Sequence, residues 1–341
     1  MVTDIFPDIF IVGGGPAGLA AAIAARLKGF QVVVADAAQP PIDKACGEGL
    51  MPDSLQALRR LGVALDREQS FAFRGIRFLG AGSTVAADFR RESGIAVRRT
   101  RLHQLLIDRA AAVGVKLQWR TPVKDLNAIR ARWIVGADGQ NSRVRRWAGL
   151  DDARRGSFRY GFRRHYRVRP WTEHMEIYWG PGCQMYVTPV GAGEACAALI
   201  TRDPHVRVDT VMPHFPELAR RIQGAEIVSE ERGAVTATRR LRHIYRDRTV
   251  LIGDASGSVD AITGEGISLA FRQALMLADA LESGDLRTYQ AGHRRLMRRP
   301  TYMAQLMLLL DRFPRARPHV LRLFAAEPVI FERLLAVHAG A

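Results

Sequence analysis

Apolar and polar positions alternate in blocks at the start of the chain. Apolar runs at residues 9–12 and 32–35 flank a glycine-rich segment at 13–18 and the alanine- and leucine-rich run that follows it. Short runs of consecutive apolar residues are typical of strands buried on both faces, and the alanine-rich run is long enough for a helix. The pattern therefore predicts a strand, a tight turn, a helix and a second strand, which Asp36 ends.

Further along, the spacing of apolar residues distinguishes helical from extended segments. Apolar positions that recur every three or four residues predict helices at 54–61, 101–113, 211–223 and 267–281 and across 287–339. Alternating or aromatic segments between glycine and proline turns predict strands at 73–79, 83–89, 95–97, 117–120, 132–136, 158–169, 174–179, 184–188, 194–200, 233–242 and 249–252.

The order of these elements predicts an α/β protein with an inserted lobe. Alternating strands and helices near the start, middle and end favour one Rossmann-type domain made of residues 1–75, 98–155 and 240–290. The strand-rich segments 76–97 and 156–239 predict an antiparallel β-sheet domain for the substrate. Residues 291–341 are expected to form a C-terminal helical region.

The first turn has glycines at the G-x-G-x-x-G spacing, namely Gly13, Gly15 and Gly18. The first glycine would let the chain leave the strand, the second would admit a pyrophosphate, and the third would let the helix lie close to the sheet. Asp36 stands where an acidic residue meets a ribose. This predicts a dinucleotide site, with flavin and nicotinamide dinucleotides both open; a glycine-rich turn of some other α/β protein is the alternative.

Composition narrows the class of protein. The chain has 341 residues and a net charge of +16, from 50 Lys and Arg against 34 Asp and Glu. No zinc-finger, helix-turn-helix or RNA-binding pattern accompanies this charge, so no nucleic acid partner is expected. The basic surface suits anionic dinucleotides and would allow peripheral contact with an acidic membrane face.

The cysteines and the hydropathy pattern indicate location. Cys46, Cys183 and Cys196 are too widely spaced for a disulfide framework or a metal cluster, so we expect no metal and a cytoplasmic protein. The chain starts without a signal-like segment, and no apolar run has the ~18 residues that span a bilayer.

Two further motifs follow the first in order. Asp138-Gly139-x-x-Ser142-x-x-Arg145 is the second, and Gly253-Asp254-Ala255 with Thr263-Gly264-Glu265-Gly266 is the third. Ser142 of the second motif is expected to cap a short helix that follows it. Together the three motifs resemble those of the group A flavoprotein monooxygenases, typified by para-hydroxybenzoate hydroxylase, and of their geranylgeranyl-reductase-like relatives. The resemblance implies a glutathione-reductase-like FAD-binding domain, with FAD as cofactor.

The resemblance also implies how the FAD is held. The first turn and helix would hold its pyrophosphate, through Gly13, Gly15, Pro16, Ala17 and Gly18, and Asp36 its ribose. Asp138 and Gly139 resemble the motif that touches both FAD and NAD(P)H. Gly253 and Asp254 would meet the ribityl chain. The isoalloxazine ring would lie against Gly264, Glu265, Gly266, Ile267, Arg99, Cys46 and Gly47.

Two reactions and one non-enzymatic role follow from the resemblance. The first is a monooxygenase that uses NAD(P)H as transient donor and O₂, through a flavin C4a-hydroperoxide, to hydroxylate an apolar, aromatic, phenolic or polyketide-like small molecule. The second is saturation of isoprenoid double bonds, favoured by the loop around Cys46, which resembles the geranylgeranyl-reductase branch. A flavin-bound, membrane-associated protein without activity is the third.

Candidate substrate contacts come from the predicted sheet lobe. His165 would act as general base, and Tyr178 and Tyr186 would orient a substrate hydroxyl. Each of the three could instead be a packing residue of a sheet. Cys46 likewise has two interpretations, a group that tunes the flavin site and a small packing residue, of which packing is favoured.

Overall fold

The computed structural model describes residues 6–80, 82–152 and 154–339. One layer is a six-stranded sheet in the order β16-β17-β9-β1-β2-β8, in which β1 lies parallel to β2 and β9. Its strands are β1 Ile9–Val12, β2 Val32–Ala35, β8 Lys116–Gln118, β9 Trp133–Gly136, β16 Tyr245–Arg246 and β17 Thr249–Leu251. This sheet and its helices confirm the predicted Rossmann-type domain.

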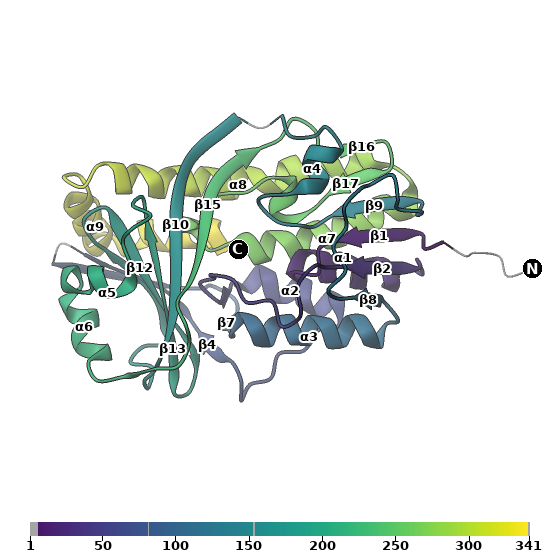
Figure 1. Ribbon diagram of the computed structural model, residues 1–341. Coiled ribbons are helices and arrows are strands. Elements are labelled where there is room, and N and C mark those ends of the chain that lie inside the picture. The colour runs from purple at the N-terminus through teal and green to yellow at the C-terminus, as the bar shows by residue number, and fades with distance from the viewer. Residues whose placement is uncertain (1–5, 81, 153, 340–341) are drawn as a thin grey trace, which may run out of the picture.

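Helices from distant parts of the chain cover this sheet (Figure 1). They are α1 Pro16–Leu27, α2 Pro52–Leu61, α3 Arg99–Ala112 and α7 Gly266–Ser283, and the short α4 Arg143–Trp147 follows β9. Leu19 and Ile23 of α1 and Phe271 of α7 share one buried core with Ile9 and Ile11 of β1. The close packing of α1 on α7 brings the start and the end of this domain together.

A large second sheet forms the other lobe. Its strands follow the order β14-β10-β13-β12-β11-β5-β6, and β15 also pairs with β10. They are β5 Gly75–Gly80, β6 Ser83–Asp88, β10 Arg154–Arg167, β11 His174–Trp179, β12 Cys183–Gly191, β13 Glu194–Thr201, β14 Glu226–Ile227 and β15 Arg232–Arg240. The sheet is antiparallel as predicted, except that β11 lies parallel to β5.

A third, small sheet joins β3 Gly49–Leu50, β7 Gly94–Ala96 and β4 Phe71–Phe73. The expected β-sheet domain included residues 76–97. The strand predicted at 95–97 therefore lies in the small sheet and not in the large one. It pairs instead with the strand that follows Glu48. The small sheet thus fixes the loop before β3 to the start of α3.

The two faces of the large sheet are covered by different helices. On one face lie α5 Val208–Val211 and α6 Pro216–Ile222, separated by a 3₁₀ turn at Met212–His214. A single helix was expected over 211–223, but Pro213 and Pro216 start new turns and cannot continue a helix because they lack an N–H. The other face packs against the C-terminal helices.

The predicted C-terminal helical region is three helices, α8 Leu286–Arg312, α9 Arg317–Ala326 and α10 Pro328–Ala339. They run along the large sheet, and the chain ends near the start of α7 in the centre of the molecule (Figure 1). None of the helices in the described ranges is both long enough and apolar enough to cross a membrane.

Candidate active site

The glycine turn between β1 and α1 is shaped by contacts that only glycine permits. Gly13 has φ +114°, and a Cβ there would lie 2.4 Å from the Ala137 carbonyl oxygen. A Cβ on Gly18 would lie 1.8 Å from the Gly13 oxygen, so α1 could not approach the turn. A Cβ on Gly15, in contrast, would meet no atom within 4 Å. The turn therefore presents bare backbone, next to the start of α1, to whatever binds there.

Two side chains hold this turn. Asp36 Oδ2 accepts a hydrogen bond from the Gly14 N–H at 2.7 Å. His103, fully buried, contacts the Gly14 carbonyl through Nε2 at 2.7 Å, while its Nδ1 accepts from the Ile42 N–H. Because Nδ1 accepts, the proton is on Nε2, and burial lowers the pKa of His103. Sequence reasoning missed His103, whose only signal was a polar residue on the apolar face of a predicted helix.

The second motif has a structural role. Both Asp138 oxygens are occupied by the start of α4: Oδ1 accepts from Ser142 Oγ at 2.5 Å and Oδ2 from the Arg143 N–H at 2.6 Å. Ser142 caps this helix as predicted. The carboxylate expected to touch FAD and NAD(P)H is thus a helix cap, and Gly139 (φ +78°) follows it.

Arg145 connects the second motif to the third. It is almost completely buried, and its Nη1 donates to the Ala255 carbonyl at 3.1 Å while Nε donates to Asp151 at 2.8 Å. Gly253, after β17, donates its N–H to Gln273 of α7 at 2.7 Å. These bonds fix the turn that carries Asp254.

Asp254 is exposed on the turn after β17. Desolvation by the surrounding protein nevertheless raises the pKa of its carboxyl, an effect that the charges of Lys44, Arg99 and Arg145 oppose. Its carboxylate makes no side-chain hydrogen bond to any residue in the described part of the chain. A carboxylate in that position can accept hydrogen bonds from the hydroxyl groups of a ligand.

The residues of the three motifs fit FAD. A Cβ on Gly15, Gly47, Gly264 or Gly266 would meet nothing within 4 Å, so the backbone at these glycines is open to a ligand. The Arg99 Nε atom is buried without a hydrogen-bond partner among the described residues. Pro16 and Ala17 form the first turn of α1, and Ile267 belongs to the first turn of α7.

Of the two arginines at the start of α3, Arg98 and Arg99, Arg99 is the one whose charge acts on Asp254 and Cys46. Arg98 instead pairs with Glu194 at 3.1 Å. This supports the choice of Arg99 as the cofactor contact.

Glu265 differs from the expectation. Its carboxylate is buried and turned toward the C-terminal helices, with Oε1 3.7 Å from Arg299 and Oε2 3.4 Å from His338 Nδ1. Burial raises the pKa of Glu265 to about 8 and lowers the pKa of His338 to about 4. With its carboxylate turned away, Glu265 can contribute to a cofactor site through its backbone, which immediately precedes α7.

The central feature that sequence reasoning missed is a buried pair between Glu48 and His165. Glu48 has φ +62° and is 3% exposed. Its Oε2 lies 2.6 Å from His165 Nε2, and its Oε1 accepts from the Arg99 N–H at 2.9 Å. The pair joins the loop before β3, the start of α3 and strand β10 of the large sheet.

The neighbours of His165 indicate which of its ring nitrogens carries the proton. Arg98 and Arg163 approach His165 Nδ1 at 3.2 and 3.1 Å, and a guanidinium only donates. Nδ1 therefore accepts, and Nε2 carries the proton that it donates to Glu48. Because both nitrogens are engaged and the ring is buried, the predicted role of His165 as general base toward a substrate is corrected: His165 positions the Glu48 loop.

Cys196 lies beside this pair, and its thiol approaches the Cys46 carbonyl at 3.7 Å. Potential ligand atoms of Glu48, His165 and Cys196 lie within 4.8 Å of one another. Desolvation raises the pKa of Cys196 well above its usual value, and His165 has its proton directed at Glu48. Because these groups already bond one another and the Cys46 backbone, we interpret the group as a hydrogen-bonded cluster.

The two tyrosines lie on opposite faces of the large sheet. Tyr186 faces the C-terminal helices, and its hydroxyl donates to the Ile262 carbonyl at 2.7 Å. Tyr178 packs on Phe215, and its hydroxyl donates to Glu176 at 2.7 Å. Side chains alternate along a strand, so only Tyr186 shares the face of the third motif, and Tyr178, predicted as a substrate contact, lies on the face that packs against α5 and α6.

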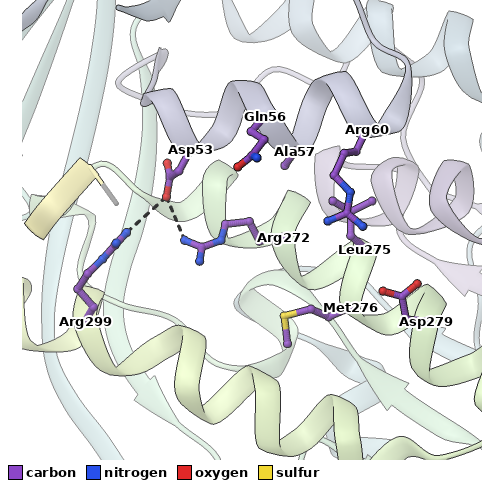
Figure 2. A pocket seen from close by; sticks show the side chains of 9 residues that line it. All are labelled: Asp53, Gln56, Ala57, Arg60, Arg272, Leu275, Met276, Asp279 and Arg299. Atoms are coloured by element: carbon purple, nitrogen blue, oxygen red, sulfur yellow. Dashed lines mark hydrogen bonds and ion pairs between the residues drawn. The ribbon is translucent and has the colours of Figure 1, made fainter. Parts of the chain in front are cut away.

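A separate cavity of about 280 Å³ lies between α2, α7 and α8. Figure 2 shows three arginines, one from each helix, pointing into it. Asp53 accepts from Arg272 at 3.0 Å and from Arg299 at 3.4 Å, while Arg60 lies at the other end (Figure 2). One carboxylate shared by two guanidiniums leaves donors for an anion.

Residues 7–284 match the family model described as "FAD binding domain". The chain belongs to this FAD-binding family. It is an FAD-dependent oxidoreductase, and its fold confirms the expected α/β architecture.

Relatives of this family member are named for different reactions. A menaquinone reductase of Mycolicibacterium smegmatis is 29% identical, and the alignment covers 90% of this chain and 85% of that protein. A digeranylgeranylglycerophospholipid reductase of Methanothrix thermoacetophila is 28% identical, over 82% of this chain and 79% of that protein. The solved structure of a flavin-dependent brominase superposes with a TM-score of 0.84 at 20% identity, covering 99% and 94% of the two chains.

Proposed function

We propose that this protein uses FAD to reduce a carbon–carbon double bond in the isoprenoid chain of a lipid. The observation that carries the proposal is the loop 44–49, which is held beside the FAD site by the buried Glu48–His165 pair. The same loop led to the geranylgeranyl-reductase resemblance. The two reductases described above support the same substrate class, because their names indicate an isoprenoid quinone and a geranylgeranyl lipid as substrates.

Reduction of an alkene needs a hydride for one carbon and a proton for the other. FAD, reduced and bound between the three glycine loops, would supply the hydride. Cys46 belongs to the loop 44–49, and burial raises the pKa of its thiol, so this thiol can supply the proton. The Glu48 N–H donates to Cys46 Sγ at 3.3 Å and orients it. We assign Cys46 Sγ as the proton source, in place of the packing role that the sequence favoured.

The electrons come from NAD(P)H in this proposal. The cavity of Figure 2 supports a place for its phosphates, because guanidinium groups of Arg60, Arg272 and Arg299 suit phosphate oxygens. Arg299 also lies 3.7 Å from Glu265 at the start of α7, so the cavity borders the FAD loops. Arg60→Gln should raise KM for NADPH several-fold and leave kcat unchanged, whereas Arg67→Gln, an exposed arginine outside the cavity, should change neither.

Incubation without oxygen tests the reaction. Enzyme, NADPH and menaquinone or a geranylgeranyl lipid should yield a product two hydrogens heavier, and Cys46→Ala should lower its rate of formation while still binding FAD. Hydroxylation of an aromatic substrate is the alternative from the sequence. A product that forms only in air and contains an atom of labelled oxygen gas would establish hydroxylation and refute the reductase.

A further inference from the structure

Large apolar side chains are exposed mainly on the three C-terminal helices. Seven of the thirteen exposed large hydrophobic residues in the described part of the chain belong to α8, α9, α10 and the turn after α8. Their exposed fractions run from 39% to 62%. They are Tyr302, Leu309, Phe313, Leu323, Val329, Ile330 and Val337. An apolar surface of this kind on one helical unit marks an interaction site.

Along α8, exposed basic and apolar residues form a single stripe. Arg295, Arg298, Tyr302, Leu309 and Arg312 are all exposed, and they recur at steps of three, four and seven residues. Such steps place side chains on one face of a helix. The stripe is about 25 Å long at 1.5 Å per residue. The opposite face of α8 is buried against the large sheet, through Ala304 and Met307.

Basic residues accompany the apolar ones. Residues 286–341 contain ten arginines and three acidic residues. Arg312 and Arg315 flank Phe313 at the turn from α8 to α9, and all three are exposed. Asp311, the acidic residue nearest to this turn, is buried and paired with Arg202. Exposed arginines around an aromatic and a leucine are the composition of surfaces that lie on anionic lipid.

The position of the stripe connects it to the substrate face. The C-terminal helices pack on the face of the large sheet that carries Tyr186, and His338 of α10 reaches Glu265 at the start of α7. In Figure 1 they run along the large sheet to the centre of the molecule. A lipid that leaves the membrane at α8 would therefore meet the C-terminal helices, which cover the Tyr186 face of the large sheet.

We propose that the outer stripe of α8, together with Phe313 and Arg315 of the α8–α9 turn, docks onto the surface of an anionic bilayer. Leucine and phenylalanine enter the boundary between headgroups and acyl chains, and the arginines bind lipid phosphates. The lipid substrate is taken from the proposed function, on which this part of the inference rests. The docking itself is independent of turnover, so vesicle binding and catalysis can fail separately.

Vesicle flotation of the FAD-loaded protein tests the docking, with vesicles of phosphatidylcholine alone or mixed with phosphatidylglycerol. We expect binding to the mixed vesicles that weakens with salt, and much weaker binding to phosphatidylcholine. The double variant Leu309→Ser/Phe313→Ser should reduce binding at least tenfold. Arg312→Gln/Arg315→Gln should reduce it about fivefold per arginine, on anionic vesicles only.

Ile227→Ser is the matched control, because Ile227 is 52% exposed on β14, outside the C-terminal helices. It should bind vesicles as the wild type does. Circular dichroism and bound flavin show whether each variant is folded. The proposal is overturned if the wild-type protein does not bind mixed vesicles, or if Leu309→Ser/Phe313→Ser binds them as the wild type does. A solution dimer that Leu309→Ser/Phe313→Ser dissociates also overturns it, since a second copy would then cover the stripe.

Discussion

Replacing Glu48 by glutamine tests whether the buried pair with His165 holds the loop beside the FAD site. The substitution keeps the size and shape of the side chain and removes its charge. The carboxylate accepts from the Arg99 N–H at 2.9 Å and from His165 Nε2 at 2.6 Å. A glutamine amide has one oxygen, so its NH₂ group must face one of these two donors.

The expected loss follows from the kind of bond that is broken. A hydrogen bond to a charged group contributes about 1.5–3 kcal/mol, and a buried donor left without an acceptor costs about 1–3 kcal/mol. Both Glu48 and His165 are almost completely buried, so water cannot replace the lost bond. We expect Glu48→Gln to lower the free energy of unfolding by about 2–4 kcal/mol.

Urea unfolding followed by circular dichroism measures this loss, and flavin fluorescence measures FAD affinity. Glu68→Gln is the control, because Glu68 is exposed. His165→Gln and the double variant complete a cycle, in which we expect a coupling of about 1 kcal/mol or more between the two positions. FAD should bind more weakly to Glu48→Gln, since Glu48 orients the loop that contains Gly47. A Glu48→Gln protein within about 0.5 kcal/mol of wild type, with normal FAD affinity, would refute the role assigned to the pair.

Three further predictions concern the cofactor site and its surroundings. Asp254→Ala should purify without FAD but folded, as judged by the visible spectrum and circular dichroism, because only the ligand's hydroxyl groups lose a partner. Gly15→Ala should weaken FAD binding and leave the stability of the apoprotein unchanged, whereas Gly18→Ala should destabilise it, since its Cβ would lie 1.8 Å from the Gly13 oxygen. Burial raises the pKa of Glu265 from 4.5 to about 8, so the folded state binds the extra proton and the contribution of Glu265 to stability should fall as pH rises between these values, against the opposite contribution of His338, whose pKa burial lowers. Glu265→Gln should remove this part of the pH dependence in urea titrations, and an unchanged slope would contradict it.

The sequence by itself determined the features that depend on neighbours along the chain. The glycine spacing of the first turn, the strand and helix around it, the Ser142 cap and the start of α7 all follow from local backbone requirements, and the structure has them where they were predicted. The break between α5 and α6 was also readable, because Pro213 cannot continue a helix. The apolar spacing continues across this proline, so spacing alone predicts one uninterrupted helix over 211–223.

Tertiary structure alone decided which distant side chains meet. Glu48 and His165 are 117 positions apart, and nothing local marks either as half of a buried pair. Tyr178 and Tyr186 belong to adjacent strands, and the register between β11 and β12 sets them on opposite faces. A register depends on strand pairing and core packing, which a sequence pattern specifies only for one strand at a time. The same holds for Glu265, whose carboxylate points toward the C-terminal helices because Arg299 and His338 pack beside it.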